Sequence, residues 1–449
     1  MLLEDCPLEP KFCIIGAGFA GLRAARHFEQ LGVDYLILEG SDRVGGRVYP
    51  FEYREGYLQY GAEYINGVEN EVYGIAKKLG LLAGRTEDLW MLDESTITVV
   101  DGEKVDGETM KVFRDFVRDL NETLYLESET LSGSAEDRIE YHLSQRSAPN
   151  PKTLEKLCKI YKNYFQTEWS SPINELSLAN LSLWDDGTDA EDSAVLNHLG
   201  FQKILEDLKS RIPKERIRLN SKVLNVHYSG PLVHVELSSG EVLSFDSVLV
   251  TSSLGYLKSH HGELFSPKLP RGKQDAIERM GYGSNLKVFL EYEGAWWPRD
   301  TSTIMICCEG EMEDFMVFQP SSWAENILTC WIAGNGPSLM AEKPDSEVQK
   351  LLDHHLKTHL TSLAPPESLR VLRKDWITDE FALGSYSYLT PGQDKRDILT
   401  LGEPILREGG RPLVCFAGEH TDPTMYQTTV GAARSGLREA IRMTKAFCE

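Results

Sequence analysis

The chain has 449 residues, which is long enough for two or three lobes with substantial cores. Its formal net charge of −22 at pH 7 argues against nonspecific binding to nucleic acid or to acidic membranes. No run reaches the roughly 18 consecutive apolar residues of a transmembrane helix. From the charge and the missing apolar run together, we expect neither nucleic acid nor a membrane as a partner.

The first informative stretch is an apolar run that leads directly into Gly-x-Gly-x-x-Gly, formed by Gly16, Gly18 and Gly21. Residues 22–31 have helical character, and a second apolar run ends at Glu39. In such a βαβ unit the glycines allow a tight turn, a close approach of the backbone to a pyrophosphate, and close helix packing. The helix N-terminus favours the phosphate charge, and Glu39 can accept hydrogen bonds from an adenosine ribose. The pattern predicts a dinucleotide site, with a purely structural glycine turn as the alternative.

A second glycine pair follows shortly after the acidic strand end, and reads Gly-Gly-Arg at residues 45–47. Gly46 and its neighbour admit a second approach of the backbone to the pyrophosphate, and Arg47 supplies a fork of charged donors. A glycine turn beside a solvated arginine is the alternative. Together with the βαβ unit, this start resembles the FAD-binding start of the flavin-containing amine oxidases.

The resemblance covers essentially the whole chain and implies an α/β fold. A glutathione-reductase-like FAD-binding domain is expected from residues 1–70, 196–260 and 396–449. A substrate domain of mixed sheet plus helices is expected, with its helical part at residues 71–195 and its sheet part at residues 261–395.

The segment around residue 64 resembles one that runs beside the flavin ring in animal polyamine oxidases. The resemblance places Gly61 and Ala62 at the cofactor. Tyr64 stands where tryptophan is usual, and Asn66 stands where those enzymes carry histidine. Because asparagine does not titrate near neutral pH, Asn66 offers a hydrogen bond to a substrate amine but no proton transfer.

Apolar residues repeat at helical spacing over residues 72–81, 108–124 and 154–165, so residues 72–208 are expected to be mainly helical. Residues 127–151 are polar and are expected to include a surface loop.

Strand patterns follow, and one buried strand ends near Thr251. By resemblance, Val223 contacts the adenine through its backbone and Thr251 ends its strand near the dinucleotide. From the residues alone, both are ordinary strand positions.

Lys287 lies inside the apolar strand 286–290, on the face opposite Leu286, and must find a partner, a cavity or water. In flavin amine oxidases a lysine in a matching Asn-x-Lys strand contacts flavin N5 through a water, and Asn285 with Lys287 fits that pattern. The alternative is an edge-strand lysine that extends to solvent.

The segment 375–387 resembles a family segment in which a tryptophan packs near the isoalloxazine, and this places Trp376 there. Monoamine oxidases carry a cysteine in the matching Gly-Cys-Tyr-Thr that links covalently to FAD. Here that position is Ser385, so non-covalent FAD is expected.

The last block is a buried strand ending in Gly418 and Glu419, followed by a loop and a helix N-terminus rich in small residues. By resemblance, Glu419 meets the ribityl-pyrophosphate region and Val430 reaches the flavin pyrimidine edge. Gly418 and Thr429 are also expected to bind the cofactor. Tyr426 matches an aromatic that forms one wall of the substrate cage.

The eight cysteines show no zinc-binding or C-x-x-C spacing, and no metal site is expected. The acidic N-terminus is too short in apolar residues for a signal peptide, and the C-terminus carries no Ser-Lys-Leu address. The sequence therefore predicts a reduced, cytoplasmic protein.

Within the family, the resemblance is greatest to polyamine oxidases. It implies oxidation of a polyamine C–N bond with O₂, giving an aldehyde, an amine and hydrogen peroxide. Lys287, Tyr426 and Asn66 are the expected catalytic residues, and Glu63, Glu168 and Glu175 are candidates to bind distal ammonium groups. Another amine oxidase, acting on monoamines or modified lysine, is the alternative, as is a flavin-binding protein with little turnover. The chain is expected to be a monomer or a homodimer.

Overall fold

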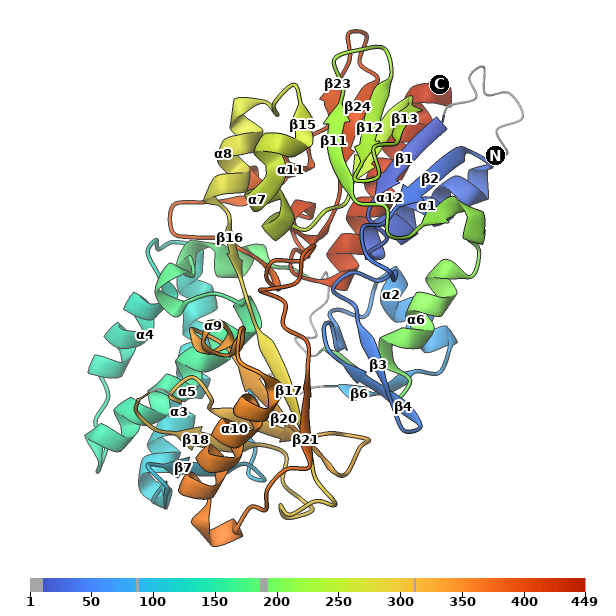
Figure 1. Cartoon of the computed structure of the whole chain (residues 1–449). Helices are drawn as coiled ribbons and strands as arrows, with labels where there is room; N and C mark the ends of the chain where they lie inside the picture. The colour runs from blue at the N-terminus through green and yellow to red at the C-terminus, as the bar shows by residue number, and fades with distance from the viewer. Residues whose placement is uncertain (1–10, 86–88, 186–192, 311, 449) are drawn as a thin grey trace.

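The computed structural model describes residues 11–85, 89–185, 193–310 and 312–448. The acidic N-terminal start with Cys6 and the last residue, Glu449, lie outside them. The described chain is α/β, with one body built around a parallel sheet in the upper half of Figure 1 and a second body around a larger sheet in the lower half. Among the described helices, none is long and apolar enough to cross a membrane.

The predicted βαβ unit is confirmed, with β1 (Lys11–Ile15), α1 (Phe19–Leu31) and β2 (Asp34–Leu38). It belongs to a six-stranded sheet of order β10-β2-β1-β14-β24-β23, whose other strands are Ile217–Arg218 (β10), Ser247–Val250 (β14), Pro412–Phe416 (β24) and Ile405–Leu406 (β23). All neighbours are parallel except β23 and β24. The carboxyl ends of the four central strands therefore meet at one edge, where open α/β sheets bind their ligands.

Both faces of this sheet are covered, which explains its nearly continuous apolar strands. Phe12 and Ile14 of β1 pack with α1 and the C-terminal helix α12 (Thr429–Cys448). Cys13 and Ile15 pack instead toward a four-stranded sheet. That sheet contains Val223–His227 (β11), Val233–Leu237 (β12), Val242–Phe245 (β13) and Phe265–Ser266 (β15).

The lower body contains a seven-stranded sheet of order β21-β17-β20-β19-β18-β7-β8. Its strands are Arg370–Arg373 (β21), Leu286–Glu291 (β17), Ile327–Ile332 (β20), Val317–Pro320 (β19), Ile304–Cys307 (β18), Ile97–Val100 (β7) and Glu103–Lys104 (β8). Helix α10 (Asp345–His359) packs on the face that carries Leu286 and Val288. Because side chains alternate along a strand, Lys287 points to the opposite face.

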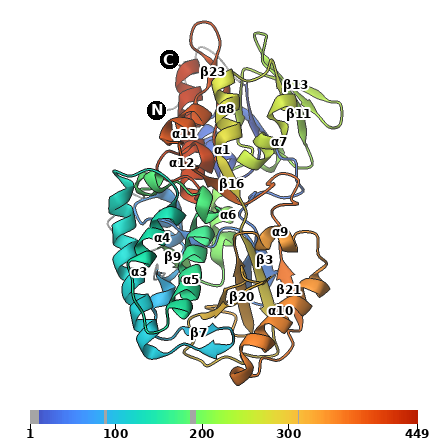
Figure 2. The ribbon, with the colours of Figure 1, turned by 90° about the vertical axis from the view of Figure 1, so that its left-hand side faces the viewer.

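Three helices lie on the other side of the lower body, as Figure 2 shows. They are α3 (Gly107–Ser128), α4 (Ala135–Ser144) and α5 (Pro151–Trp169). The polar stretch at 127–151 includes segments outside helices at 129–134 and 145–150, as predicted, and residues 135–144 between them form α4. Ser134 caps this helix, with reciprocal hydrogen bonds to Asp137. The polar composition of this stretch therefore did not indicate the exposed helix, whose sequence signal is the N-cap formed by Ser134 and Asp137.

Shorter elements connect the two bodies. They are the hairpin β3 (Pro50–Tyr53) and β4 (Gly56–Gln59), the sheet of β5 (Tyr64–Ile65), β9 (Ala194–Leu196) and β6 (Leu82–Arg85), and the helices α2 (Glu71–Lys78) and α6 (Gly200–Lys209). The region 72–208 is thus mainly helical, as predicted, but also contains short strands. β16 (Gly281–Gly283) pairs with β22 (Tyr386–Tyr388) where the chain passes between the bodies.

The boundary expected at residue 260 falls inside helix α7 (Leu254–Leu264). Helix α8 (Arg271–Arg279) packs on α7 and on α11 (Lys395–Gly402), which belong to the upper body. We propose that the second segment of the FAD domain continues through Arg279.

Candidate active site

One cavity of about 840 Å³ runs between the two bodies. It begins at the carboxyl edge of the six-stranded sheet and continues to β17, β20 and α5 of the lower body. Most residues singled out in the sequence line it, namely Gly16, Gly18, Glu39, Gly46, Arg47, Gly61, Ala62, Asn66, Val223, Thr251, Lys287, Trp376, Gly418, Glu419 and Thr429. Gly21, Tyr426 and Val430 are not part of its lining.

The first glycine turn is closed on its protein side and open toward the cavity. Gly16 has a φ of +105°, and a Cβ there would lie 2.5 Å from Oγ1 of Thr251. A Cβ at Gly21 would lie 2.1 Å from the carbonyl oxygen of Gly16, which explains how α1 packs against the turn. A Cβ at Gly18 would meet no protein atom within 4 Å. Gly18 is therefore the position where a bound group, rather than the protein, would meet an added side chain.

The second glycine segment lies directly beside the first. The amide of Gly45 donates to the carbonyl oxygen of Ala17 over 2.8 Å, and Gly45 and Gly46 have φ of +110° and +58°. These left-handed conformations favour glycine. The two segments together form a surface of backbone at the N-terminus of α1.

Glu39 is fixed at the end of β2, as an adenosine-binding carboxylate would need. One of its oxygens accepts from the amide of Ala17 over 2.6 Å, and the other accepts from the amide and hydroxyl of Ser41, both over 2.8 Å. A carboxylate has about four acceptor positions, so Glu39 keeps capacity for a ribose hydroxyl.

Half-buried Arg47 and buried Glu419 form an ion pair in the cavity wall. Nη1 of Arg47 donates to Oε1 of Glu419 over 2.9 Å and to the carbonyl oxygen of Ser385 over 2.6 Å. Oε2 of Glu419 accepts from the Ser387 hydroxyl over 2.7 Å and from the amide of Gln427 over 2.9 Å. Burial alone would raise the pKa of Glu419, but the charge of Arg47 and these contacts outweigh it, so the pKa lies below its usual value. The pair therefore stays ionised.

Several buried polar atoms along the cavity have no protein partner among the described residues. They include Oγ1 of Thr429 at the N-terminus of α12, Oδ1 of Asn285 and Nε1 of Trp331. Buried polar groups are rarely left unpaired in native proteins. The open backbone at Gly18, the fixed Glu39 and these unpaired atoms fit an extended dinucleotide.

Lys287 lies at the far end of this wall and does not reach solvent. Its ammonium donates to the carbonyl oxygen of Gly61 over 2.7 Å and to Oε2 of Glu63 over 2.8 Å, with the ring of Trp331 at 5.0 Å. Burial lowers the pKa of Lys287, and the charge of Glu63 opposes that shift. The alternative of an edge-strand lysine in solvent is therefore wrong.

Aromatic rings surround Lys287. Tyr64 and Trp331 stack with ring centroids 6.4 Å apart, and both line the cavity. Tyr386 also lines it; its hydroxyl accepts from Nδ2 of Asn285 over 2.6 Å and donates to the carbonyl oxygen of Thr167 over 2.7 Å. Sequence reasoning assigned no role to Tyr386, although it directly follows Ser385 in the Gly-Ser-Tyr-Ser segment.

A family model of flavin-containing amine oxidoreductases matches residues 19–444. The chain belongs to this family. Among curated relatives, the bovine protein named peroxisomal N(1)-acetyl-spermine/spermidine oxidase is 28% identical, over 97% of this chain and 94% of its own length. Its human counterpart is also 28% identical, over 98% and 96%. Polyamine oxidase 1 of rice (Oryza sativa subsp. japonica) is 27% identical, over 98% of each chain.

The cofactor of this amine oxidoreductase is FAD. Ser385 stands at the position of the covalent-flavin cysteine of monoamine oxidases. Its hydroxyl accepts from the amide of Asn285 over 2.9 Å and donates to the carbonyl oxygen of the same residue over 3.1 Å. No cysteine of the described residues lines the cavity. The part of the chain that the structure describes therefore places no thiol at the cavity for attachment to the flavin.

We expect acid to release all of the flavin, because only non-covalent contacts hold it. The measurement is acid precipitation of the purified enzyme, followed by chromatography of the supernatant. Intact FAD should account for the whole flavin content. Flavin fluorescence that stays with the precipitated, denatured chain would contradict this expectation.

Tyr426 does not form a cavity wall, and this corrects the sequence-based interpretation. Its side chain is fully buried, and its ring packs on Trp169 with centroids 6.2 Å apart. Gln427 and Thr428 line the cavity instead. Gln427 has a φ of +74°, and its side chain donates to the carbonyl oxygen of Trp169 over 3.2 Å. This turn sends the preceding tyrosine inward.

Val430 is also buried away from the cavity. It packs in the core cluster that joins α12 to α1 and the parallel sheet. Any contact of residue 430 with a flavin edge would have to use the backbone, since its side chain is part of that core.

Asn66 and the three predicted acids have different surroundings. Nδ2 of Asn66 donates to Oγ of Ser193 over 3.0 Å at the cavity surface. Glu63 and Glu168 line the cavity, whereas Glu175 does not; it accepts from the Tyr388 hydroxyl over 2.7 Å. Glu175 is therefore removed from the candidates for ligand binding.

Proposed function

We propose that this enzyme oxidises a C–N bond of a polyamine. The observation that carries the proposal is that one cavity is lined by the dinucleotide surface, by Lys287 and its aromatic neighbours, and by Glu168 on α5. Aromatic rings beside a reacting amine, with an anionic group in the same cavity, suit an elongated substrate with several ammonium groups. Three relatives, from cattle, human and rice, are named for oxidation of acetylated or free polyamines.

Bound FAD would take two electrons from the carbon next to the amine nitrogen and pass them to O₂, giving hydrogen peroxide, while the imine product hydrolyses to an aldehyde and an amine. The residues of the chain position the reactants. Tyr64, Trp331 and Tyr386 exclude water and orient the amine. Asn66 offers hydrogen bonds without exchanging protons near neutral pH. Lys287 presents a proton donor held by Glu63.

Glu168 is the residue that we propose binds a distal ammonium group. Burial, and then the charges of Glu63 and Glu168, raise the pKa of Tyr64. Burial and the Glu168 carboxylate likewise raise the pKa of Tyr386. Glu168 therefore lies near enough to act electrostatically on both rings, and a second amine of the substrate would meet its carboxylate there. Glu63 is held by Lys287 and is the weaker candidate.

We infer that the six-stranded sheet and its covering layers form a glutathione-reductase-like FAD domain. We also propose a cytoplasmic location, which is supported by six free, buried cysteines: Cys13, Cys158, Cys307, Cys308, Cys330 and Cys415.

Replacement of Glu168 by glutamine tests the substrate. We expect kcat/KM for spermine to fall about 10–100-fold, because a charge-assisted contact contributes about 1.5–3 kcal/mol. Activity with a monoamine of similar width should change little. The matched control is Glu175→Gln, outside the cavity, which should leave both values near those of the wild type. Equal losses for spermine and the monoamine would contradict the role of Glu168 in polyamine binding.

A further inference from the structure

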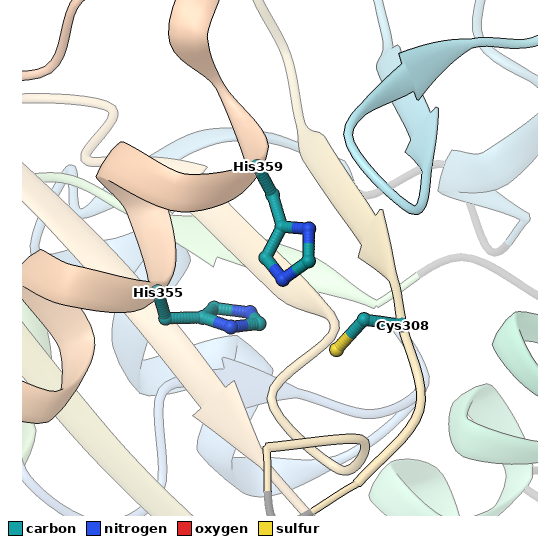
Figure 3. A group of neighbouring side chains, drawn as sticks. All are labelled: Cys308, His355 and His359. Carbon is teal, nitrogen blue, oxygen red and sulfur yellow. The ribbon is translucent and has the colours of Figure 1, made fainter.

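Two histidines and a cysteine come together in the lower body, away from the active-site cavity (Figure 3). His355 and His359 lie one turn apart on α10 and therefore share a face of that helix. Cys308 directly follows β18. One ligand atom from each of the three side chains lies within 4.8 Å of the others, and Figure 3 shows the side chains facing a common space.

The surroundings hold these side chains in place. Cys308 and His355 are 5% and 3% exposed. Nε2 of His355 lies 3.0 Å from the carbonyl oxygen of Phe315. A backbone carbonyl that accepts from one ring nitrogen fixes the tautomer and leaves the other nitrogen as a ligand, which is the usual outer-shell arrangement around metal-binding histidines.

A second, independent observation concerns His359, the third proposed ligand. Nδ1 of His359 is buried and has no hydrogen-bond partner among the described residues. The turn after β7 packs against this end of α10, since a Cβ at Gly102 would lie 3.8 Å from Cα of His359. Asp101 in that turn is paired with Lys156, whose ammonium donates to its carboxylate over 2.6 Å.

We propose that Cys308, His355 and His359 bind one zinc-class divalent cation. One thiolate and two neutral imidazoles are a donor set that Zn²⁺ prefers and that Mg²⁺ and Ca²⁺ do not. Binding would release the thiol proton to solvent, and water would complete a tetrahedral site. Small side-chain rotations would bring the ligand atoms to the roughly 3.5 Å spacing that Zn–S and Zn–N bonds of about 2.3 and 2.0 Å require.

The proposed ion would tie the end of α10 to the end of β18, an interior strand of the sheet. None of its ligands lines the active-site cavity. The same sheet carries Lys287 on β17 and Trp331 on β20. The role that we infer for the ion is therefore structural: it would stabilise the sheet that places these two residues at the cavity. The sequence signal was the His-x-x-x-His spacing on a helix, whereas cysteine spacing alone indicated no metal.

The test uses the FAD-loaded full chain, treated with chelator and then titrated separately with Zn²⁺ and Co²⁺. We expect one ion per chain, and a Co²⁺ spectrum with tetrahedral bands at wavelengths longer than those of oxidised flavin. Loss of an outer-shell contact lowers metal affinity about 10–100-fold. His359→Ala and Cys308→Ala each remove a ligand, so each should weaken Zn²⁺ binding by more than that.

Two neighbours provide matched controls. His354 is exposed on the same helix, and the thiol of Cys307 donates to the carbonyl oxygen of Lys156 over 2.9 Å. His354→Ala and Cys307→Ala should keep wild-type affinity. A retained flavin spectrum shows that each variant is folded, and His359→Gln replaces any variant that loses it. Absence of stoichiometric binding, or equal binding by ligand variants and controls, would overturn the proposal.

Discussion

Replacement of Gly18 by valine should give a folded protein that has lost its flavin. A Cβ at residue 18 meets no atom of the protein within 4 Å, and Gly18 lines the cavity where we propose that the backbone approaches the pyrophosphate. We expect FAD affinity to fall about 100-fold, which corresponds to about 3 kcal/mol of steric conflict. The measurement is the flavin content after purification, together with titration of the apoprotein with FAD.

The control for this variant is Gly262→Val. Gly262 is exposed in α7, and an added Cβ there also meets nothing within 4 Å. This variant should bind FAD normally. Gly16→Ala is a useful contrast. Gly16 has a φ of +105°, and an added Cβ would lie against the Thr251 hydroxyl, so this substitution should strain the fold itself. Normal flavin content in Gly18→Val would show that the cofactor does not lie against this turn.

Replacement of Lys287 by methionine should slow reoxidation of the reduced flavin by O₂ at least about 100-fold, while FAD binding changes little. A proton donor placed at the reacting group commonly contributes about 10²–10⁴-fold in rate. Lys287 is buried at the cavity wall, and Glu63 and the Gly61 carbonyl hold its ammonium. The measurement is stopped-flow mixing of the anaerobically reduced enzyme with oxygenated buffer.

Loss of a buried lysine also affects stability, so this variant needs a control of similar burial. Lys273 is 4% exposed, and its ammonium donates to the carbonyl oxygen of Leu401 over 2.8 Å, outside the cavity. Lys273→Met should lower stability without slowing reoxidation. If Lys287→Met reoxidised at the wild-type rate, the proposed role of Lys287 near the flavin would be refuted.

The sequence predicted those residues of the site whose positions depend only on neighbouring residues in the chain. Gly16, Gly18 and Glu39 follow from a βαβ pattern whose spacing sets the turn and the strand end. Lys287 could be assigned to one face of its strand because side chains alternate with a period of two. These residues reach the cavity by rules that act within a few positions of the chain.

The remaining features depend on contacts between distant segments. The direction of Tyr426 follows from the positive φ of Gln427, which Trp169 and Glu419 hold in place. The role of Tyr386 becomes visible only where β16 and β22 pair between the two bodies.

The cluster of Cys308, His355 and His359 likewise requires α10 to pack on its sheet. Sequence spacing shows the two histidines on one helical face, but it does not show which cysteine lies opposite them.

Anaerobic titration of the purified enzyme tests the central claim most directly. Spermine, N1-acetylspermine and benzylamine would be added separately while the visible flavin spectrum is recorded. We predict that a polyamine bleaches the flavin band and that benzylamine does not. Bleaching by benzylamine alone would assign the enzyme to monoamines. A flavin band that no amine changes would contradict amine oxidation by this cavity.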